Sequence, residues 1–437
     1  MPSLSLFSAG SNAQGQLATG SVADAYSFAP AIFLRAQQAG ALPPGSLGIS
    51  QIACGANHTL VLIACEDSAE RELWGSGDGR RGQLGPSFCA ASKTVQGEQT
   101  EVDMGPLPVF RRLDLQLEGG ARDLRGYTPR LIAAGWETSY IVLARAGQSD
   151  VLLAMGADDF GNRGVGGRGK GKEREEPWHI VELERFVNAS QGKTILTVKS
   201  LTTGPHTVIA QILVSSRDND CQAQELMFGW GASRHGQLGG AEHKPPSFYA
   251  SPHPVVLPEG AQERGKVAAC ALGTQHTVFL HGSGRLSGIG SNRKAQLRGI
   301  GTLEGVTAIG CTWNGTYAVM HDGSFVATGS HVRGLLGAGE EGVSALAMVR
   351  FPFESGSREL LKMACGSEHV LCLFALRDTA TEVWGWGWNE HGTLGIGSTG
   401  DVEAPVRVWP PASEGLHLGK AVDVWAGCGT SWILVER

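Results

Sequence analysis

The sequence predicts an all-β fold, a seven-bladed β-propeller that forms one domain over residues 1–437. Three observations predict it: two short motifs alternate along the chain, each motif recurs seven times, and 63 glycines are spread over the whole length. Scattered glycines favour many tight turns. Alternating strand motifs that repeat every ~40 to 80 residues are typical of a propeller with one repeat per blade.

The first motif is a short apolar strand followed by a turn of the form Gly-x-Asn/Asp-x-x-Gly-Gln-Leu-Gly. The first glycine of the turn marks each copy: Gly10, Gly77, Gly156, Gly231, Gly290, Gly329 and Gly387. The distance from Gly290 to Gly329 is the shortest, 39 residues, and predicts a shortened blade. The longer distances predict loop insertions near residues 86–130, 163–177, 215–225 and 239–264.

The second motif reads Ala-Cys-Gly-x-x-His-Thr and precedes another apolar strand. Its copies begin at residues 53, 134, 203, 272, 310, 364 and 426. They place four histidines at equivalent positions: His58, His206, His276 and His369. A ring of four imidazoles suggests a metal site, but repetition alone explains the spacing. We therefore predict no metal site, and expect each imidazole to hydrogen-bond a turn carbonyl beside the central channel.

The two ends of the chain carry complementary halves of a repeat. The chain starts with a first motif and finishes with a second motif, so the last copy lacks outer strands and the first copy lacks inner ones. Pairing the terminal strands would close the ring and remove two exposed sheet edges. We therefore expect that neither terminus can be trimmed without loss of stability.

Composition narrows the function classes. A net charge of −6 argues against a nucleic-acid binder. Nine cysteines without CxxC spacing indicate reduced thiols in place of a zinc or redox site. Neither a signal peptide nor an apolar run long enough to span a membrane is present in the sequence. These features predict a protein of the cytoplasm, with the nucleus as a second location, that binds neither nucleic acid directly nor a membrane.

No catalytic constellation is found in the sequence. G-x-S-x-G and HExxH motifs are absent, and no nucleophile is paired with a base. The carboxylates at the motif turns are of the type that caps turn backbone. We therefore predict a protein that is not an enzyme, with no catalytic residues and no cofactor of its own.

The tryptophans interrupt this regular pattern. Trp136 and Trp313 fall in turns of the second motif, whereas Trp386 and Trp388 fall in a turn of the first. One interpretation is local packing over glycines, and the other is an aromatic patch for a protein partner. The predicted partner-binding residues are Trp386, Trp388, Glu390, His391, Trp136, Glu137, Trp230, Trp313 and Trp432. Replacing Trp386 and Trp388 together by alanine is expected to weaken binding and leave the melting temperature nearly unchanged.

The two motifs resemble the regulator of chromosome condensation repeat over the whole chain. A narrower resemblance, to the fungal alpha-tubulin suppressor family that also carries a killer-toxin-insensitivity name, rests on the irregular copies. These include Ala-Gly-Trp-Glu-Thr-Ser-Tyr from residue 134, Cys-Thr-Trp from residue 311, and the run Trp-Gly-Trp-Gly with the following Glu-His-Gly. The chain departs from that pattern at the insertions near 86–130 and 163–177 and at Asn389, an extra residue within the tryptophan run.

The narrower resemblance implies a non-enzymatic scaffold. It implies a heterodimer with a small CSL-type zinc protein, which can also hold iron, so zinc or iron is expected only in the partner. The pair would support diphthamide synthesis on elongation factor two and Elongator-dependent modification of tRNA wobble uridines.

Two other functions occur on the same kind of propeller. One is guanine-nucleotide exchange on a Ran-like GTPase, although the basic tail of that branch is missing from this sequence. The other is ultraviolet-B sensing, which relies on Gly-Trp-Arg-His-Thr motifs. The nearest match in this chain is Gly135-Trp136-Glu137-Thr138-Ser139, which lacks the arginine.

Overall fold

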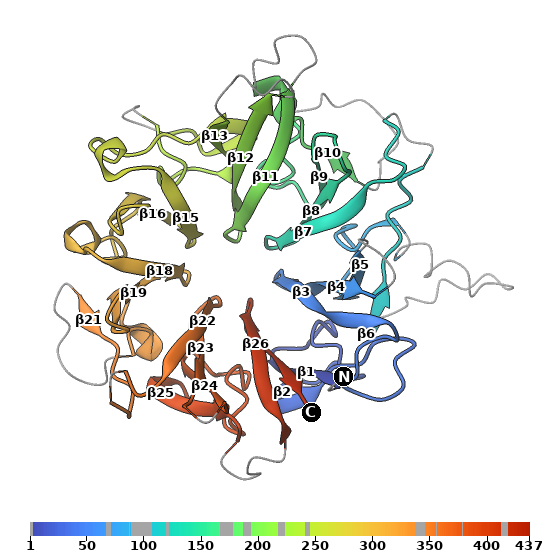
Figure 1. Cartoon of the computed structure of the whole chain (residues 1–437), viewed down its shortest axis with the longest axis vertical. Coiled ribbons are helices and arrows are strands. Elements are labelled where there is room, and N and C mark those ends of the chain that lie inside the picture. The colour runs from blue at the N-terminus through green and yellow to red at the C-terminus, as the bar shows by residue number, and fades with distance from the viewer. Residues whose placement is uncertain are drawn as a thin grey trace, which may run out of the picture.

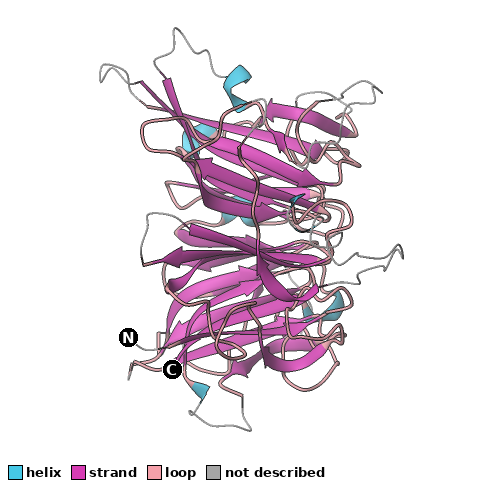
Figure 2. Ribbon diagram, turned by 90° about the vertical axis from the view of Figure 1, so that its right-hand side faces the viewer, coloured by secondary structure: helices cyan, strands magenta, loops and turns pink. Residues whose placement is uncertain are grey.

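The computed structural model is a ring of seven antiparallel sheets around a central channel (Figure 1). It describes residues 3–66, 71–86, 88, 107–118, 122–166, 178–186, 194–216, 223–240, 245–337, 346–354, 356–377, 379–411 and 418–437. Viewed from the side, the strands run across the thickness of the ring (Figure 2). The prediction of a seven-bladed β-propeller is confirmed. No helix in these ranges is both long and apolar enough to cross a membrane.

Blades 1 to 3 each contain four strands, named in order from the channel outward. Blade 1 comprises β3 (Ser46–Cys54), β4 (His58–Cys65), β5 (Arg71–Gly77) and β6 (Leu107–Arg112). Blade 2 comprises β7 (Thr128–Ala134), β8 (Thr138–Ala144), β9 (Val151–Gly156) and β10 (His179–Ile180). Blade 3 comprises β11 (Thr194–Thr203), β12 (Thr207–Ser216), β13 (Gln224–Ala232) and β14 (Phe248–Pro254).

Blades 4 to 7 complete the ring. Blade 4 comprises β15 (Val267–Leu272), β16 (His276–His281) and β17 (Leu286–Gly290). Blade 5 comprises β18 (Val306–Cys311), β19 (Gly315–Met320), β20 (Phe325–Gly329) and β21 (Ala347–Met348). Blade 6 comprises β22 (Glu359–Cys365), β23 (His369–Ala375), β24 (Thr381–Gly387) and β25 (Val402–Trp409). Blade 7 comprises β26 (Lys420–Ala426), β27 (Thr430–Glu436), β1 (Leu4–Gly10) and β2 (Ala25–Pro30).

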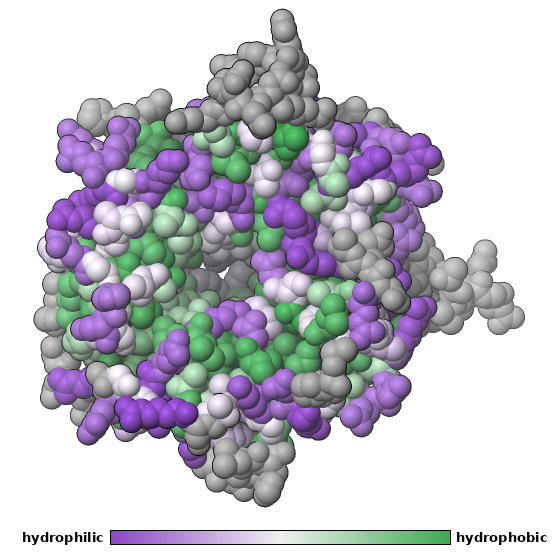
Figure 3. Space-filling view, viewed as in Figure 1, coloured by the Kyte–Doolittle hydropathy of each residue, from purple (hydrophilic) through white to green (hydrophobic). Residues whose placement is uncertain are grey.

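Short 3₁₀ helices lie between strands: η1 (Leu183–Phe186), η3 (Gln262–Arg264), η4 (Ile300–Thr302) and η5 (Val332–Gly334). On the face shown in Figure 3, hydrophilic residues predominate at the rim, whereas hydrophobic and hydrophilic residues both border the central opening.

Blade 7 closes the ring, as predicted. Strand β1 pairs with β27 along its full length, from Leu4 opposite Glu436 to Gly10 opposite Thr430. The two termini lie side by side (Figure 1). Leu6 and Phe7 of β1 are buried, and Leu6 belongs to the same apolar cluster as Trp432 of β27. The N-terminal strand is therefore a structural part of the last blade.

We expect Leu6→Ala to lower the free energy of unfolding by about 2–5 kcal/mol, because it would leave a cavity in a fully buried cluster. The matched control is Leu47→Ala, because Leu47 is a strand leucine that is 51% exposed. Urea unfolding followed by tryptophan fluorescence measures both variants. Equally small effects would show that β1 is peripheral to the fold.

The shortened repeat is also confirmed, because blade 4 has three strands. The outer edge of β17 is covered by other groups. The Arg264 guanidinium donates a hydrogen bond to the Leu286 carbonyl oxygen of β17, and Ile300 of η4 packs in the same apolar cluster as Leu286. A side chain and a helical turn thus replace the fourth strand, and they limit the pairing of this edge with another chain.

The expected insertions lie partly outside the described residues. Within residues 86–130, residues 107–112 form β6, and within residues 239–264, residues 248–254 form β14. These two parts are outer strands of blades, not insertions. Residues 89–106, 167–177, 217–222 and 241–244, which hold a large part of the remaining predicted insertion sequence, lie outside the described residues.

The marker glycine of the first motif is required by a close backbone approach. All seven marker glycines have φ between +88° and +131°, a region that favours glycine. A Cβ atom at Gly77 would lie 2.3 Å from the Asn57 carbonyl oxygen, and one at Gly156 would lie 2.2 Å from that of Glu137. In both cases the oxygen belongs to a turn of the second motif. The two motifs are therefore in direct contact in each blade.

Three of the four motif histidines bond between blades. The Nε2 atoms of His58, His276 and His369 lie 2.9–3.1 Å from a hydroxyl oxygen of the next blade, in Ser139, Thr316 and Ser431 respectively. The Nε2 partner is therefore a hydroxyl group, where a turn carbonyl was expected, although His276 and His369 also interact with the backbone of Gly315 and Thr430 in the next blade. All three imidazoles are buried, and burial lowers the pKa of each from 6.5 to about 4. They are neutral links between neighbouring blades at pH 7.

His206 departs from this pattern. In blade 3 it is Thr207 that pairs with the marker glycine Gly231, whereas in blade 1 His58 pairs with Gly77. His206 is therefore one position earlier than the other three, in the turn itself, and the predicted equivalence is wrong for it. It is partly exposed, and its Nδ1 atom lies 3.4 Å from Asn162 of blade 2.

Candidate partner-binding face

The turns of both motifs lie on one face of the ring. Each second-motif turn joins the innermost strand of a blade to the next strand, and each first-motif turn follows the third strand. Because β4 and β5 are antiparallel with His58 opposite Gly77, the two turns meet at the same end of the blade. The same pairing recurs in the other blades, for example His369 opposite Gly387. We call this side the motif-turn face.

The first-motif turns present two variable residues, the third and fourth after the marker glycine. We call these the tip pairs: Ala13–Gln14, Arg80–Arg81, Asp159–Phe160, Arg234–His235, Arg293–Lys294, Val332–Arg333 and Glu390–His391. The glutamine of the motif holds four of these turns, because its side-chain oxygen accepts a hydrogen bond from the second tip residue, as Gln83 does from the Arg81 N–H. The scaffold therefore fixes the backbone and leaves the tip side chains free to differ.

Two tryptophans meet at the mouth of the channel. Trp136 of blade 2 and Trp313 of blade 5 line the channel opening, and their ring centroids are 5.9 Å apart. Both are partly exposed. Their backbones are fixed, because Trp136 N–H donates to the Pro205 oxygen at 2.7 Å and Trp313 N–H donates to the Ser367 oxygen at 2.7 Å. Two predicted residues far apart in sequence thus form one aromatic contact.

Further rings extend this aromatic centre outward. The His206 ring lies 6.1 Å from that of Trp136, and the Phe160 ring lies 4.6 Å from that of His206. Phe160 is a tip residue that is 41% exposed. The aromatic centre, which comprises Trp136, Trp313, His206 and Phe160, is the kind of surface that anchors protein partners.

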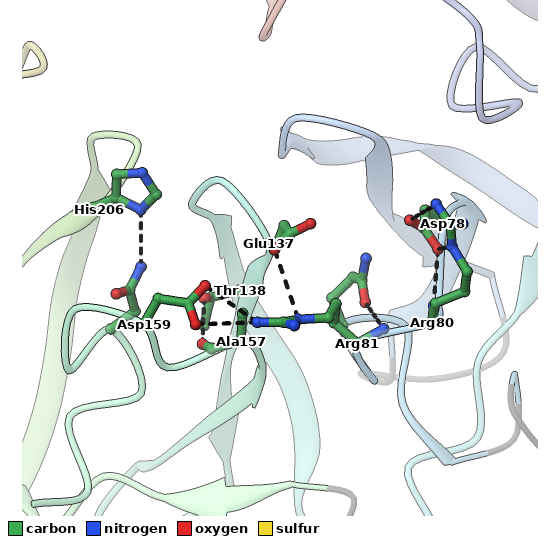
Figure 4. A network of polar contacts seen from close by, with 10 residues as sticks. Asp78, Arg80, Arg81, Glu137, Thr138, Ala157, Asp159 and His206 are labelled. Carbon is green, nitrogen blue, oxygen red and sulfur yellow. Dashed lines mark hydrogen bonds and ion pairs between the residues drawn. The ribbon is translucent and has the colours of Figure 1, made fainter.

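A charged network borders the aromatic centre (Figure 4). The Arg81 guanidinium lies 3.1 Å from Asp159 and 3.7 Å from Glu137, and so links blade 1 to blade 2. Arg80 pairs with Asp78 at 2.9 Å. The pKa of Asp78 is lowered: burial acts to raise it, but hydrogen bonds and charge from Arg80 outweigh burial. The arginines of this tip pair are thus neutralised by neighbouring carboxylates.

A second cluster surrounds Trp388, which is partly exposed. The indole N–H of Trp388 donates to Glu390 at 3.2 Å, and the His391 ring lies 5.3 Å away. The Arg333 guanidinium of blade 5 lies over the Trp388 ring at 5.4 Å. His391 Nδ1 is 2.8 Å from the Asp24 carboxylate, so this cluster joins blades 5, 6 and 7.

Three of the nine predicted residues are buried in the interior. Trp386, Trp230 and Trp432 have 0% exposure. The indole N–H of Trp386 donates to the Leu335 oxygen at 3.1 Å, and that of Trp230 donates to the Asn162 oxygen at 2.8 Å. A completely buried indole cannot contact a partner, so the prediction of a surface role is wrong for these three tryptophans. Because Trp386 is buried, we now expect the joint replacement of Trp386 and Trp388 by alanine to lower the melting temperature.

The other six predicted residues are accessible and lie on the motif-turn face. They are Trp136, Glu137, Trp313, Trp388, Glu390 and His391. Sequence reasoning missed Arg333, Phe160 and His206. The tip positions of Arg333 and Phe160 were a usable signal, because both directly precede the second glycine of a first-motif turn.

The chain was compared with known protein families, and the matching segments coincide with the repeats described above. The Regulator of chromosome condensation (RCC1) repeat matches residues 5–62, 225–280 and 382–434. The chain therefore contains RCC1 repeats in these three ranges. The first of these ranges includes the Ala-Cys-Gly copy with His58, and the last includes the tip pair Glu390–His391 and the closing strand β27.

Three relatives that align over most of this chain are named for different functions or only for their repeats. An RCC1 repeat-containing protein of Schizosaccharomyces pombe is 24% identical, with 99% of each chain covered. The secretion-regulating guanine nucleotide exchange factor of Bos taurus is 25% identical over 99% of this chain and 72% of its own length. The ultraviolet-B receptor UVR8 of Arabidopsis thaliana is 23% identical over 88% of this chain and 76% of its own length.

Solved structures agree on the fold. Human WBSCR16 superposes with a TM-score of 0.66 at 20% identity, and 99% of each chain is covered. Prp20p of Saccharomyces cerevisiae superposes with a TM-score of 0.65 at 17% identity, covering 100% of this chain and 92% of that one. At such identities the likeness establishes the propeller and not the function.

The aromatic centre of this RCC1 repeat protein lacks an arginine partner within the described residues. Arginine lies over Trp388, Trp384, Phe353 and Phe7, but over neither Trp136 nor Trp313. Trp136 therefore has an arginine neighbour neither in the motif sequence nor over its ring among the described residues.

Proposed function

We propose that the chain is a non-catalytic binding propeller that docks a protein partner on its motif-turn face. The observation that carries the proposal is the contact of Trp136 with Trp313 at the channel mouth, inside the aromatic centre. Exposed aromatic rings held by a rigid backbone bind at low entropic cost, and a charged rim favours one orientation of the partner. The accessible predicted residues Glu137, Trp388, Glu390 and His391 lie on the same face.

We further propose that this partner is a small CSL-type zinc protein, and that the pair supports diphthamide synthesis and Elongator-dependent tRNA modification. The narrower resemblance of the irregular repeats supports this choice. Zinc or iron would then belong to the partner. Location in the cytoplasm and nucleus stays a prediction from the sequence.

Calorimetric titration with a recombinant CSL-type zinc protein tests the proposal. Trp136→Ala combined with Trp313→Ala should weaken binding by roughly 30-fold or more, which corresponds to the loss of a hot spot. The control is Leu47→Ala combined with Leu361→Ala. These leucines are about half exposed and lie in inner strands β3 and β22, away from the turns at the ends of those strands. Equal loss in both variants would exclude the aromatic centre as the docking site, and no binding by the wild type would exclude this partner.

A second candidate function is nucleotide exchange on a Ran-like small GTPase. It is favoured by the Bos taurus relative, which aligns over 99% of this chain and is named as an exchange factor. The same face would then contact the GTPase. Release of a fluorescent guanine nucleotide from Ran distinguishes the two candidates: acceleration by the wild type supports exchange, whereas an unchanged release rate excludes it for that GTPase.

A further inference from the structure

The tip pairs of blades 3 and 4 carry cations that have no carboxylate partner among the described residues, unlike the arginines of blades 1 and 5. Arg234 of blade 3 and both Arg293 and Lys294 of blade 4 are exposed cations at equivalent turn positions. None of the three side chains forms an ion pair within the described part of the chain. We call these three residues the cationic arc.

The two blades are neighbours, so the charges lie close together. The Thr277 hydroxyl of strand β16 in blade 4 donates to the Gln237 carbonyl oxygen at 2.7 Å, which ties the first-motif turn of blade 3 to blade 4. His235, between them, has a lowered pKa, because of its burial and then the positive charges of Arg234 and Arg293. The field at this part of the face is therefore positive, although the whole chain has a net charge of −6.

Other blades neutralise arginines at the same positions. In blade 1 the residue after the marker glycine is Asp78, which pairs with Arg80. In blade 5, Arg333 lies 3.8 Å from Glu368 and 3.7 Å from Glu390. Blades 3 and 4 carry uncharged residues, among them Ser233 and Asn292, at the turn positions that precede the cations.

The second-motif turns show the same difference. Where blade 2 has Glu137 and blade 6 has Glu368, blades 3 and 4 have His206 and Gln275. Both positions that supply carboxylates elsewhere on the face are therefore free of acid in blades 3 and 4. Unpaired, exposed cations of this kind attract an oppositely charged surface and fix its orientation.

We propose that the cationic arc receives an acidic segment of the protein partner, beside the aromatic centre of the same face. This inference rests on the proposed function and names the chemistry of the partner's contact. Carboxylate groups are favoured over a nucleic-acid backbone, because the ion-paired turns of the other blades carry a net negative charge that would repel a long polyanion. These turns hold the carboxylates Asp78, Glu137, Asp159, Glu368 and Glu390 against the arginines Arg80, Arg81 and Arg333. A short acidic segment of a protein would meet only the arc.

Fluorescence anisotropy with a labelled decapeptide of aspartate and glutamate tests the arc directly. Wild-type protein should bind the peptide, and the affinity should fall as salt rises from about 50 to about 300 mM. The variant R234E/R293E/K294E should bind at least about tenfold more weakly at the lower salt concentration. The matched control R125E/R145E/R285E changes the net charge equally at exposed residues outside the motif turns, and should bind less than about twofold more weakly.

Three outcomes would overturn the inference. They are equal weakening in both triple variants, peptide binding that does not depend on salt, and tighter binding of a labelled single-stranded oligonucleotide through the same three residues. Failure of the proposed function is distinguishable, because peptide binding at the arc does not require Trp136 and Trp313. If W136A/W313A keeps the peptide but no protein partner is bound by the wild type, the arc stands and the docking proposal falls.

Discussion

Lowering the pH from 7 to 5 should remove roughly 6 kcal/mol of unfolding free energy, roughly 2 kcal/mol for each of His58, His276 and His369. Burial lowers the pKa of each to about 4 in the folded protein, against 6.5 for an ordinary histidine. Between these values the unfolded chain binds more protons than the folded one. The stabilisation is therefore complete above pH 6.5 and is lost as the pH falls toward 4. The loss is comparable with the whole stability of many domains.

Urea unfolding at a series of pH values measures this effect. Unfolding at pH 5 should take up roughly three protons from these sites. His369→Asn should reduce that uptake by about one proton, whatever it does to stability at pH 7. His321→Asn is the control, because His321 is exposed in a turn outside the inter-blade contacts. If the unfolding free energy of His369→Asn falls with decreasing pH as steeply as that of the wild type, the inter-blade histidines do not control acid unfolding.

Trp386→Ala should lower the free energy of unfolding by about 3–5 kcal/mol, because a large, completely buried ring would be removed from the core. Trp386 packs against Tyr317 and Phe351 in the cluster between blades 5 and 6. Trp388→Ala, two residues later, should cost less than about 1 kcal/mol, as expected for a partly exposed surface residue. Chemical unfolding of the two single variants is the measurement. Comparable losses in both variants would contradict this division.

For partner binding we expect the opposite order: Trp388→Ala should have the larger effect and Trp386→Ala the smaller. Trp388 belongs to the motif-turn face and Trp386 does not, so only Trp388→Ala should weaken partner binding in protein that remains folded. A folded Trp386→Ala protein with wild-type affinity completes the expected pattern.

The number and spacing of the repeats in the sequence were sufficient to predict the fold. Seven marker glycines, the short distance from Gly290 to Gly329 and the complementary ends predicted the seven blades, one shortened blade and closure of the ring by the terminal strands. These predictions succeed because the glycine turn is a backbone requirement: a Cβ atom at Gly387 would lie 2.5 Å from the Glu368 carbonyl oxygen. Such requirements can be read from residue type alone.

The site was harder to predict, because small changes of backbone direction decide exposure. Trp386 and Trp388 look equivalent in a sequence of alternating tryptophan and glycine. Gly387 has φ +103°, which ends the strand and turns Trp388 toward the face while Trp386 stays in the blade interior. His206 shows the same limit, because a shift of one residue moves it from the inter-blade position into the aromatic centre. The meeting of Trp136 and Trp313 depends on ring closure, which no local pattern reports.

Amide hydrogen exchange of the chain alone and in complex with its co-purified partner tests the central claim, that the motif-turn face is the docking surface. We predict slower exchange on binding in the second-motif turns at residues 55–57, 135–137 and 312–314 and in the first-motif turn at residues 388–391. Protection confined instead to the opposite turns, at residues 145–149, 282–285 and 321–324, would contradict the account.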